Sequence, residues 1–226
     1  MNFDIVHPVD FQDDILTLDK TIEHSKEFKI IVPNRGTYIV IPRDDFKLQI
    51  VRKIQVPVLT EVSVAFGICR PQIAKKIFFS AGAYGVNSVT VFESSLIEGD
   101  YKTSKVYKSP ETILLDGMRQ SGSWVQPKVV LMKFRELVAN IKTESTVVFD
   151  RVTGEPCSID KILSATSFVL GPERGLTKEE IEILTSAGCQ VVSLGDLILR
   201  SHQIFDFLLG LKLVAKISAN IENTAL

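Results

Sequence analysis

The sequence predicts an α/β protein with a mostly parallel sheet, preceded by a small N-terminal β-barrel. Two regions of the chain with different sequence patterns predict this fold. Residues 1 to about 57 hold short β-type runs separated by turn signals, whereas strand-like and helix-like segments alternate from about residue 58 onward. Closely spaced short strands are typical of barrels, and alternation is typical of a parallel sheet covered by helices. We therefore expect two domains, 1–57 and 58–226.

The first domain is predicted from three runs rich in β-branched and aromatic residues. They are FKIIV (28–32), TYIVI (37–41) and FKLQIV (46–51), and the turn sequences PNRG and PRDD separate them. Proline, glycine, asparagine and aspartate are the residues that tight turns prefer. A small barrel or sandwich follows from this spacing.

Five apolar runs predict the strands of the second domain, and prolines mark where two of its helices begin. Helices are expected to open at Pro71 and at Ser109-Pro110, since proline is favoured in the first helical turn. The Lys-rich stretch 101–108 is expected to be a surface loop. The predicted strands are VSVAFGI (62–68), SVTVF (88–92), STVVF (145–149), SFVLG (167–171) and QVVSL (190–194).

Composition excludes several classes of protein. Of the 226 residues 45% are hydrophobic, enough for a sizeable core, and 26 Lys and Arg balance 27 Asp and Glu. A nucleic-acid partner must therefore be held by a local basic patch. Cys69, Cys157 and Cys189 are far apart and lack metal-ligand spacing, so neither a disulfide framework nor a metal site is expected. No long apolar segment or signal-like N-terminus is present, and a cytoplasmic protein without membrane association is expected.

The stretch FVLGPERGLTKEEI (168–181) joins a predicted strand to a predicted helix. Thr177 and Glu180 have the spacing of a capping box, so the helix is expected to begin near Lys178 and to end before Gly188. The sequence SLG (193–195) ends the next strand at an equivalent level. Two glycine-bearing turns would then lie side by side at the carboxyl edge of the sheet, where ligands of open α/β sheets bind. A plain connection without ligand is the alternative, and neither a Walker motif nor a GxGxxG fingerprint is present.

The last segment, HQIFDFLLGLKLVAKISANI (202–221), is apolar on more than one helical face. Such a helix is buried on two sides. The second side is expected to meet a partner subunit in a homodimer, with Leu208 and Leu211 on the contact face, and a core helix is the alternative.

Several motifs resemble one family. The stretch 168–203 is similar to the C-terminal signature of the RsmE-type small-subunit ribosomal RNA uridine-N3 methyltransferases, with its G-P-E-G-G turn and S-L-G-x-R-I-L-R segment. RQSGSWVQPKV (119–129) is similar to the family's E-Q-S-G-x4-P-x-V, and AGAYGV (81–86) to its A-x-E-L-G-V. His24 and Pro33 match an H-x8-P stretch in a shortened version of the family's N-terminal domain. The resemblance covers nearly the whole chain and is faint before residue 57.

This resemblance implies a fold and a cofactor. It implies a SPOUT-superfamily domain with a C-terminal trefoil knot, a PUA-like N-terminal barrel, and an active site completed across a homodimer. S-adenosylmethionine would lie in the knot, and the partner would be ribosomal RNA in the small subunit. The residues expected to hold the cofactor are Leu170, Gly171, Pro172, Gly175, Ser193, Leu194, Gly195, Ile198 and Leu199.

Two residues are expected to take part in the reaction. Methylating N3 of uracil requires removal of an imide proton and stabilisation of negative charge on the uracil oxygens. Arg200 is assigned the second task by the resemblance, and Glu173 is expected to position the base or to accept its proton. A surface salt bridge for Arg200 and a helix-start carboxylate for Glu173 are the alternatives.

The chain departs from the family pattern mainly on the substrate side. Leu197 and His202 stand where the family has its first arginine and its acid, Gln203 follows them, and Arg174 interrupts the G-P-E-G-G turn. His202 could stand in for the lost acid or cap the last helix. These changes leave cofactor binding better supported than uridine-N3 specificity.

Six basic residues are expected to track RNA phosphates, unless they form a solvated basic face. They are Arg35, Arg43, Lys47, Arg70, Lys75 and Lys76. The sequence therefore predicts an S-adenosylmethionine-dependent uridine-N3 methyltransferase of 16S ribosomal RNA. A catalytically silent RNA-binding homologue in ribosome assembly and an α/β enzyme with another nucleotide ligand are the alternatives.

Overall fold

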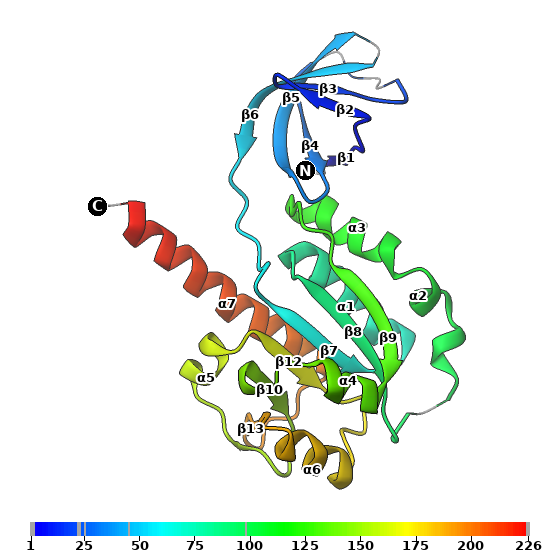
Figure 1. Ribbon diagram of the computed structural model, residues 1–226, viewed down its shortest axis with the longest axis vertical. Coiled ribbons are helices and arrows are strands. Elements are labelled where there is room, and N and C mark those ends of the chain that lie inside the picture. The colour runs from blue at the N-terminus through cyan, green and yellow to red at the C-terminus, as the bar shows by residue number, and fades with distance from the viewer. Residues whose placement is uncertain (1–2, 22–23, 25, 45, 98, 225–226) are drawn as a thin grey trace.

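The computed structural model describes residues 3–21, 24, 26–44, 46–97 and 99–224, which form two sheets (Figure 1). The first sheet has the order β1-β4-β5-β6-β3-β2, with β1 parallel to β4 and the other pairs antiparallel. It curls into a half-barrel rather than closing, and β1 and β2 are its free edges. Its strands are β1 (Asp4–Ile5), β2 (Asp10–Gln12), β3 (Ile15–Thr17), β4 (Phe28–Val32), β5 (Gly36–Asp44) and β6 (Lys47–Ile54).

The second sheet has seven parallel strands in the order β11-β13-β10-β12-β7-β8-β9. All five strands predicted from the sequence lie in it. The edge strands β9 and β11 were not predicted. The strands are β7 (Ser63–Gly67), β8 (Ser88–Glu93), β9 (Lys128–Lys133), β10 (Thr146–Phe149), β11 (Glu155–Pro156), β12 (Ser167–Leu170) and β13 (Gln190–Ser193).

Helices cover both faces of the parallel sheet. Alternate residues of a strand point to opposite faces, so Val64 and Phe66 pack on one side of β7 and Ala65 on the other. Helices α1, α3, α5 and α7 pack on the first face, and α4 and α6 on the second. The helices are α1 (Pro71–Tyr84), α2 (Lys105–Lys108), α3 (Pro110–Ser121), α4 (Phe134–Asn140), α5 (Ile159–Ser164), α6 (Lys178–Ser186) and α7 (Ser201–Thr224).

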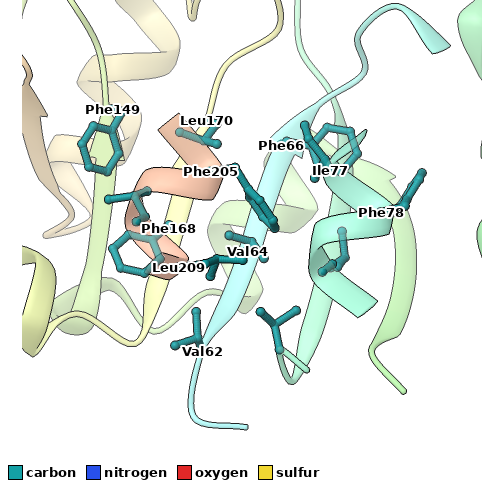
Figure 2. Packing of buried hydrophobic residues seen from close by; sticks show 14 of the residues in the cluster. Val62, Val64, Phe66, Ile77, Phe78, Phe149, Phe168, Leu170, Phe205 and Leu209 are labelled. Atoms are coloured by element: carbon teal, nitrogen blue, oxygen red, sulfur yellow. The ribbon is translucent and has the colours of Figure 1, made fainter. Parts of the chain in front are cut away.

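The larger core places α7 against the centre of the sheet. Figure 2 shows Phe205 and Leu209 of α7 between Phe66 of β7 and Phe168 of β12, all of them buried. Full burial of each such side chain stabilises the fold by about 1.5–3 kcal/mol. The position of α7 is therefore fixed by the core, and so is the loop that leads into it.

The half-barrel contacts the second sheet's domain through the end of α3. The backbone N–H of Asn34, in the β4–β5 turn, donates to the Trp124 carbonyl at 2.7 Å. The buried Thr37 hydroxyl of β5 donates to the Gly122 carbonyl at 2.6 Å. Residues 55–62 link the two sheets, and the domain boundary near residue 57 stays a prediction.

After β13 the chain passes across the carboxyl ends of two neighbouring strands before it enters α7. Strand β13 lies on one side of β10 and β12 on the other. Yet α7 begins beside the end of β12, as is shown by the hydrogen bond from the Ser201 hydroxyl to the Gly171 carbonyl at 3.0 Å. Residues 194–200 thus pass over the carboxyl ends of β10 and β12. The trefoil knot itself stays a prediction.

Candidate active site

A cavity of about 560 Å³ lies at the carboxyl edge of the parallel sheet. Its walls come from the segments that follow β10, β12 and β13 and from the first residues of α1 and α7. Pockets for small ligands and cofactors commonly measure about 300–1,000 Å³. The cavity is thus of a size that holds one cofactor.

The turn after β12 is held in a fixed shape at the cavity wall. Its Gly175 N–H donates to the Pro172 carbonyl at 2.9 Å, and Gly175 has a φ of 79°, which glycine adopts without strain. A Cβ on Gly171 would lie 2.8 Å from the Gly175 carbonyl carbon, so only glycine fits there. The capping box predicted at Thr177 and Glu180 begins α6 directly after this turn.

The turn after β13 leaves its backbone open to the cavity. Gly195 has a φ of 74°, and a Cβ built on it would meet nothing within 4 Å. The Ser193 hydroxyl accepts the Gly195 N–H at 3.1 Å and donates to the Arg151 carbonyl at 3.2 Å. These bonds tie the turn after β13 to the loop after β10.

All nine residues expected to hold a cofactor line this one cavity, as do both residues expected to take part in the reaction. The two glycine turns are therefore neighbours, as the sequence predicts. The nine residues are Leu170, Gly171, Pro172, Gly175, Ser193, Leu194, Gly195, Ile198 and Leu199.

Arg200 lies at the cavity wall immediately before α7. Its backbone N–H donates to the side-chain oxygen of Gln203 at 2.9 Å. Among the described residues its guanidinium has no ion-pair or hydrogen-bond partner, so the surface salt bridge given as the alternative is not seen in this part of the chain. The side chain is exposed and can reach a ligand in the cavity.

Glu173 has a structural partner at the opposite wall. Its Oε1 accepts the backbone N–H of Arg70, the residue that precedes α1, at 2.7 Å. The bond fixes the turn after β12 to the start of α1. It leaves Oε2 without a hydrogen-bond partner among the residues described.

The sequence reasoning missed the loop after β10. Asp150, Arg151 and Val152 line the cavity, and the Asp150 carboxylate accepts the backbone N–H groups of Val152 and Thr153. The signal was present, because Asp150 directly follows the predicted strand 145–149. Four arginines, at 70, 151, 174 and 200, thus face the cavity with only two carboxylates, Asp150 and Glu173. The site has a net positive charge.

His202 does not cap the last helix; Gln203 does. The His202 ring is buried against α1, with Nε2 at 3.5 Å from Lys76 Nζ, and its Nδ1 has no hydrogen-bond partner among the described residues. Burial and the Lys76 charge lower the pKa of this histidine. It does not line the cavity among the described residues, so it is not a replacement for an acid at the site.

The six expected RNA-binding cations do not form one patch. Arg70 lines the cavity, and Lys75 and Lys76 follow it on α1. Arg35 lies at one end of β5 and Arg43 and Lys47 at the other, where Arg43 bonds Gln49 and Lys47 lies 3.9 Å from Asp44.

The expected contact face of the last helix is corrected by the structure. Leu208 is fully buried in the core, and the Lys212 ammonium is buried and donates to the Leu163 and Ala165 carbonyls. The apolar side chains that α7 leaves uncovered are instead Phe207, Val214, Ile217 and Ile221. We call these four residues the α7 stripe.

In the described part of the chain no three His, Cys, Asp or Glu side chains gather as metal ligands would. None of the described helices is long and apolar enough to cross a membrane.

The seven-stranded parallel sheet, the crossing at its carboxyl edge and the half-barrel before it are the fold that solved structures of similar proteins share with this chain. Residues 57–203 match the RNA methyltransferase domain family, and the chain belongs to this family as an RsmE-type member. The family predicted from residues 168–203 is thereby confirmed.

Similar proteins cover most of the chain. It is 25% identical over 192 residues to the "Ribosomal RNA small subunit methyltransferase E 1" of Borreliella burgdorferi, which covers 80% of each chain. A Ribosomal RNA small subunit methyltransferase E from Neisseria gonorrhoeae, bound to S-adenosyl methionine, superposes with a TM-score of 0.74 at 16% identity, covering 92% of this chain and 95% of that one. A Legionella pneumophila protein described as a methyltransferase in complex with SAM gives a TM-score of 0.70 at 15% identity, with 95% and 98% covered. These two structures share the fold.

Proposed function

We propose that this protein methylates N3 of a uridine in small-subunit (16S) ribosomal RNA and uses S-adenosylmethionine bound in the cavity. The observation that carries the proposal is the pair of glycine turns, after β12 and β13, that form one cavity with Arg200. Similarity to a small-subunit ribosomal RNA methyltransferase supports the substrate class. Two structures of the same fold contain S-adenosylmethionine, which supports the cofactor.

The residues present fit this cofactor. Gly195 presents bare backbone to the cavity, so an adenine can approach its N–H and C=O groups closely. The surrounding arginines can pair with the carboxylate of the cofactor's methionine part, and Asp150 and Glu173 offset some of the positive charge near its sulfonium. When bound, S-adenosylmethionine supplies the methyl group that is transferred.

The reaction makes two demands on the protein. The imide proton leaves uracil N3, and the N3 electron pair then forms a bond to the methyl carbon as the carbon–sulfur bond breaks, leaving a neutral thioether. Arg200 donates hydrogen bonds to the uracil oxygens, where the negative charge develops. Arg151, whose guanidinium also has no partner among the described residues, adds a second positive charge beside the same cavity.

Glu173 is the candidate acceptor of the proton. Its Oε1 is occupied by the Arg70 N–H, and that bond holds the carboxylate at the cavity wall with Oε2 available. A carboxylate fixed in this way can take a proton from a bound base directly or through one water. Glu173 is also a positioning residue, because it links the turn after β12 to α1.

A homodimer completes the proposal. The α7 stripe is uncovered in one chain, with Val214 64% and Ile221 65% exposed. Leu197 and Ile198, at the mouth of the cavity, are exposed as well. A second copy that covers both surfaces about a two-fold axis would close the cavity and bury these apolar side chains.

The test is methyl transfer to defined RNA. Small ribosomal subunits from cells that lack the gene would be incubated with the purified protein and labelled S-adenosylmethionine, and the modified nucleoside identified by mass spectrometry. We expect 3-methyluridine at one position. Binding of RNA without transfer would support the silent homologue, and tight ATP or NAD binding without S-adenosylmethionine binding would support another nucleotide enzyme.

A further inference from the structure

The segment 101–108 was expected to be a plain surface loop, and the structure shows that it is docked. Tyr101, Val106 and Tyr107 pack against the large core cluster. The residues form a short 3₁₀ turn, Tyr101–Thr103, followed by α2. We call residues 101–108 the basic arm.

The Tyr107 hydroxyl fixes the basic arm to the turn that precedes α1. It accepts the Cys69 N–H at 2.9 Å and donates to the Cys69 carbonyl at 2.7 Å. Its ring stacks edge-on against Phe78 of α1. Burial, and next the neighbouring Cys69, raise the pKa of Tyr107, so the hydroxyl keeps its proton and can make both bonds.

This attachment point borders the candidate active site. Cys69 is followed by Arg70, which lines the cavity and whose N–H bonds Glu173. The Tyr107 hydroxyl is thus one residue away from the cavity wall.

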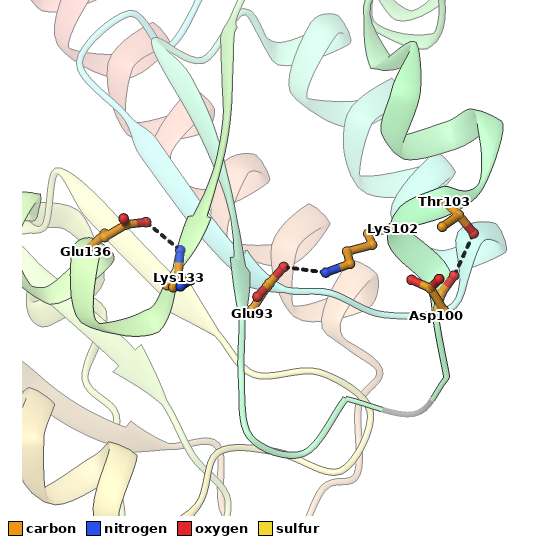
Figure 3. A network of polar contacts seen from close by, with 6 residues as sticks. All are labelled: Glu93, Asp100, Lys102, Thr103, Lys133 and Glu136. Atoms are coloured by element: carbon orange, nitrogen blue, oxygen red, sulfur yellow. Dashed lines mark hydrogen bonds and ion pairs between the residues drawn. The ribbon is translucent and has the colours of Figure 1, made fainter.

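The basic arm turns its lysines outward. Figure 3 shows Lys102 reaching back to Glu93 of β8, with an Nζ to Oε1 distance of 3.1 Å, while the Thr103 hydroxyl donates to the Asp100 carbonyl. Lys105 and Lys108 lie three residues apart on α2 and are exposed, and their ammonium groups have no partner in the described part of the chain. Lys75 of α1, three residues before Phe78, is also exposed, and its ammonium group has no partner among the described residues.

We propose that Lys105 and Lys108 of the basic arm bind phosphates of the RNA substrate beside the cavity, and that the Tyr107 hydroxyl holds them in place. The inference rests on the proposed function, because it assumes an RNA whose target base enters the cavity. Unpaired lysines on a fixed support suit a phosphate backbone, since binding releases counterions without breaking ion pairs. Arg70 lines the cavity directly before α1, and Lys75 is exposed on α1, the helix whose Phe78 contacts Tyr107.

The first experiment reverses the two charges. The variant Lys105→Glu/Lys108→Glu is compared with Lys128→Glu/Lys142→Glu, a control with the same change of charge at exposed lysines near the amino ends of β9 and β10, on the opposite edge of the sheet. Fluorescence anisotropy with small-subunit ribosomal RNA gives Kd at several KCl concentrations. Calorimetry gives the S-adenosylmethionine Kd, and methyl transfer gives kcat and KM.

The expected result is specific to the arm. The arm variant should weaken RNA binding at least tenfold at low salt, and the slope of log K against log salt should fall by about 1.4–1.8, the value for two lost phosphate contacts. Its S-adenosylmethionine affinity should stay within twofold of wild type, and the control should bind RNA nearly as wild type. Equal effects of both variants, or no effect of the arm variant, would overturn the inference.

A second variant tests the role of the hydroxyl. Tyr107→Phe removes one oxygen and keeps the ring, and Tyr101→Phe is the matched control on the same arm. We expect Tyr107→Phe to raise the KM for RNA several-fold with little change in S-adenosylmethionine affinity. An unchanged KM in a folded Tyr107→Phe protein would remove the positioning role.

The outcomes separate the inference from the proposed function. If the wild type and the arm variant methylate RNA equally well, the inference alone is contradicted. RNA binding that depends on the arm, without any methyl transfer, would contradict the proposed reaction alone. Absence of RNA binding by the wild type would overturn both.

Discussion

The carboxylate of Glu180 accepts the backbone N–H of Ser95 at 2.8 Å, so one buried side chain joins the start of α6 to the chain that leaves β8. The same carboxylate accepts the Ser94 hydroxyl and the Thr177 N–H. Glu180 therefore does more than close the capping box that the sequence predicts: it connects the turn after β12 with the segment that leads into the basic arm.

Replacing Glu180 with Ala should destabilise the fold by about 2–4 kcal/mol, because three donors lose their acceptor in a buried place. Thr177→Ala removes only the cap and should cost about 1 kcal/mol. Urea unfolding of both variants measures the difference. Equal losses would mean that the bonds to Ser94 and Ser95 contribute nothing.

Replacing Arg200 with Ala should lower kcat by roughly a hundredfold or more and leave S-adenosylmethionine affinity within a few-fold, since charge develops on uracil only in the transition state. Arg200→Lys should recover little, because an ammonium cannot present the planar pair of donors. Methyl transfer and calorimetry are measured side by side. Parallel losses of affinity and turnover would assign Arg200 to the cofactor instead.

Replacing Gly195 with Val should abolish S-adenosylmethionine binding, because the side chain would point into the cavity. Gly195 has a φ of 74°, so any side chain also strains the backbone. Gly188→Val is the control, since Gly188 has a φ of 98° at the end of α6 and does not line the cavity. Both variants should lose stability, and calorimetry should show lost binding only for Gly195→Val.

Replacing Val214 and Ile217 of the α7 stripe with Asp should convert a dimer into a monomer in sedimentation experiments, because two buried like charges per chain would face their copies. Ile183→Asp, an exposed apolar position on α6, should leave the dimer intact. A wild-type monomer at micromolar concentration would contradict the predicted assembly directly.

Acid should destabilise the protein partly through His202. Its pKa is lowered in the fold by burial and by Lys76, and Arg200 lowers it further while Asp206 raises it. The unfolded chain binds the proton more readily, so this contribution is complete above about pH 6.5 and is lost as the pH falls through the folded-state pKa. The unfolding free energy of His202→Gln should therefore decline less than that of wild type between pH 7 and pH 5, whereas His7→Gln, at an exposed position, should follow wild type.

Much of the catalytic half could be predicted because its signals are local. The five inner strands are continuous apolar runs, and the Thr177–Glu180 spacing places the start of α6 correctly. The edge strand β9 was missed because its residues, Lys128–Lys133, are largely exposed and alternate weakly. The turn predicted at Pro42 is wrong by a few residues, since β5 continues to Asp44 and Pro42 pairs with Leu48.

The parts of the site that depend on distant contacts could not be predicted. The two glycine turns were placed side by side because parallel strands end at one edge. No spacing in the sequence tells that Tyr107 reaches Cys69, or that Leu208 belongs to the core while Val214 does not. A helix that is apolar on more than one face is predicted to be covered on two sides. The sequence does not show which residues lie on which side, because that depends on how the helix packs.

The buried hydrogen bond from the Thr37 hydroxyl to the Gly122 carbonyl fixes the position of the half-barrel on the catalytic half. It anchors one end of β5 to the catalytic half, and the strand then runs outward to Arg43. Arg43 follows Arg35 by eight positions, which corresponds to at most about 26 Å at about 3.3 Å per residue. Any RNA that touches both ends must span that interval. Lengthening the β5–β6 hairpin by two residues on each strand would move the outer end of β5 by about 7 Å, so an RNA that contacts both ends would have to extend that much farther.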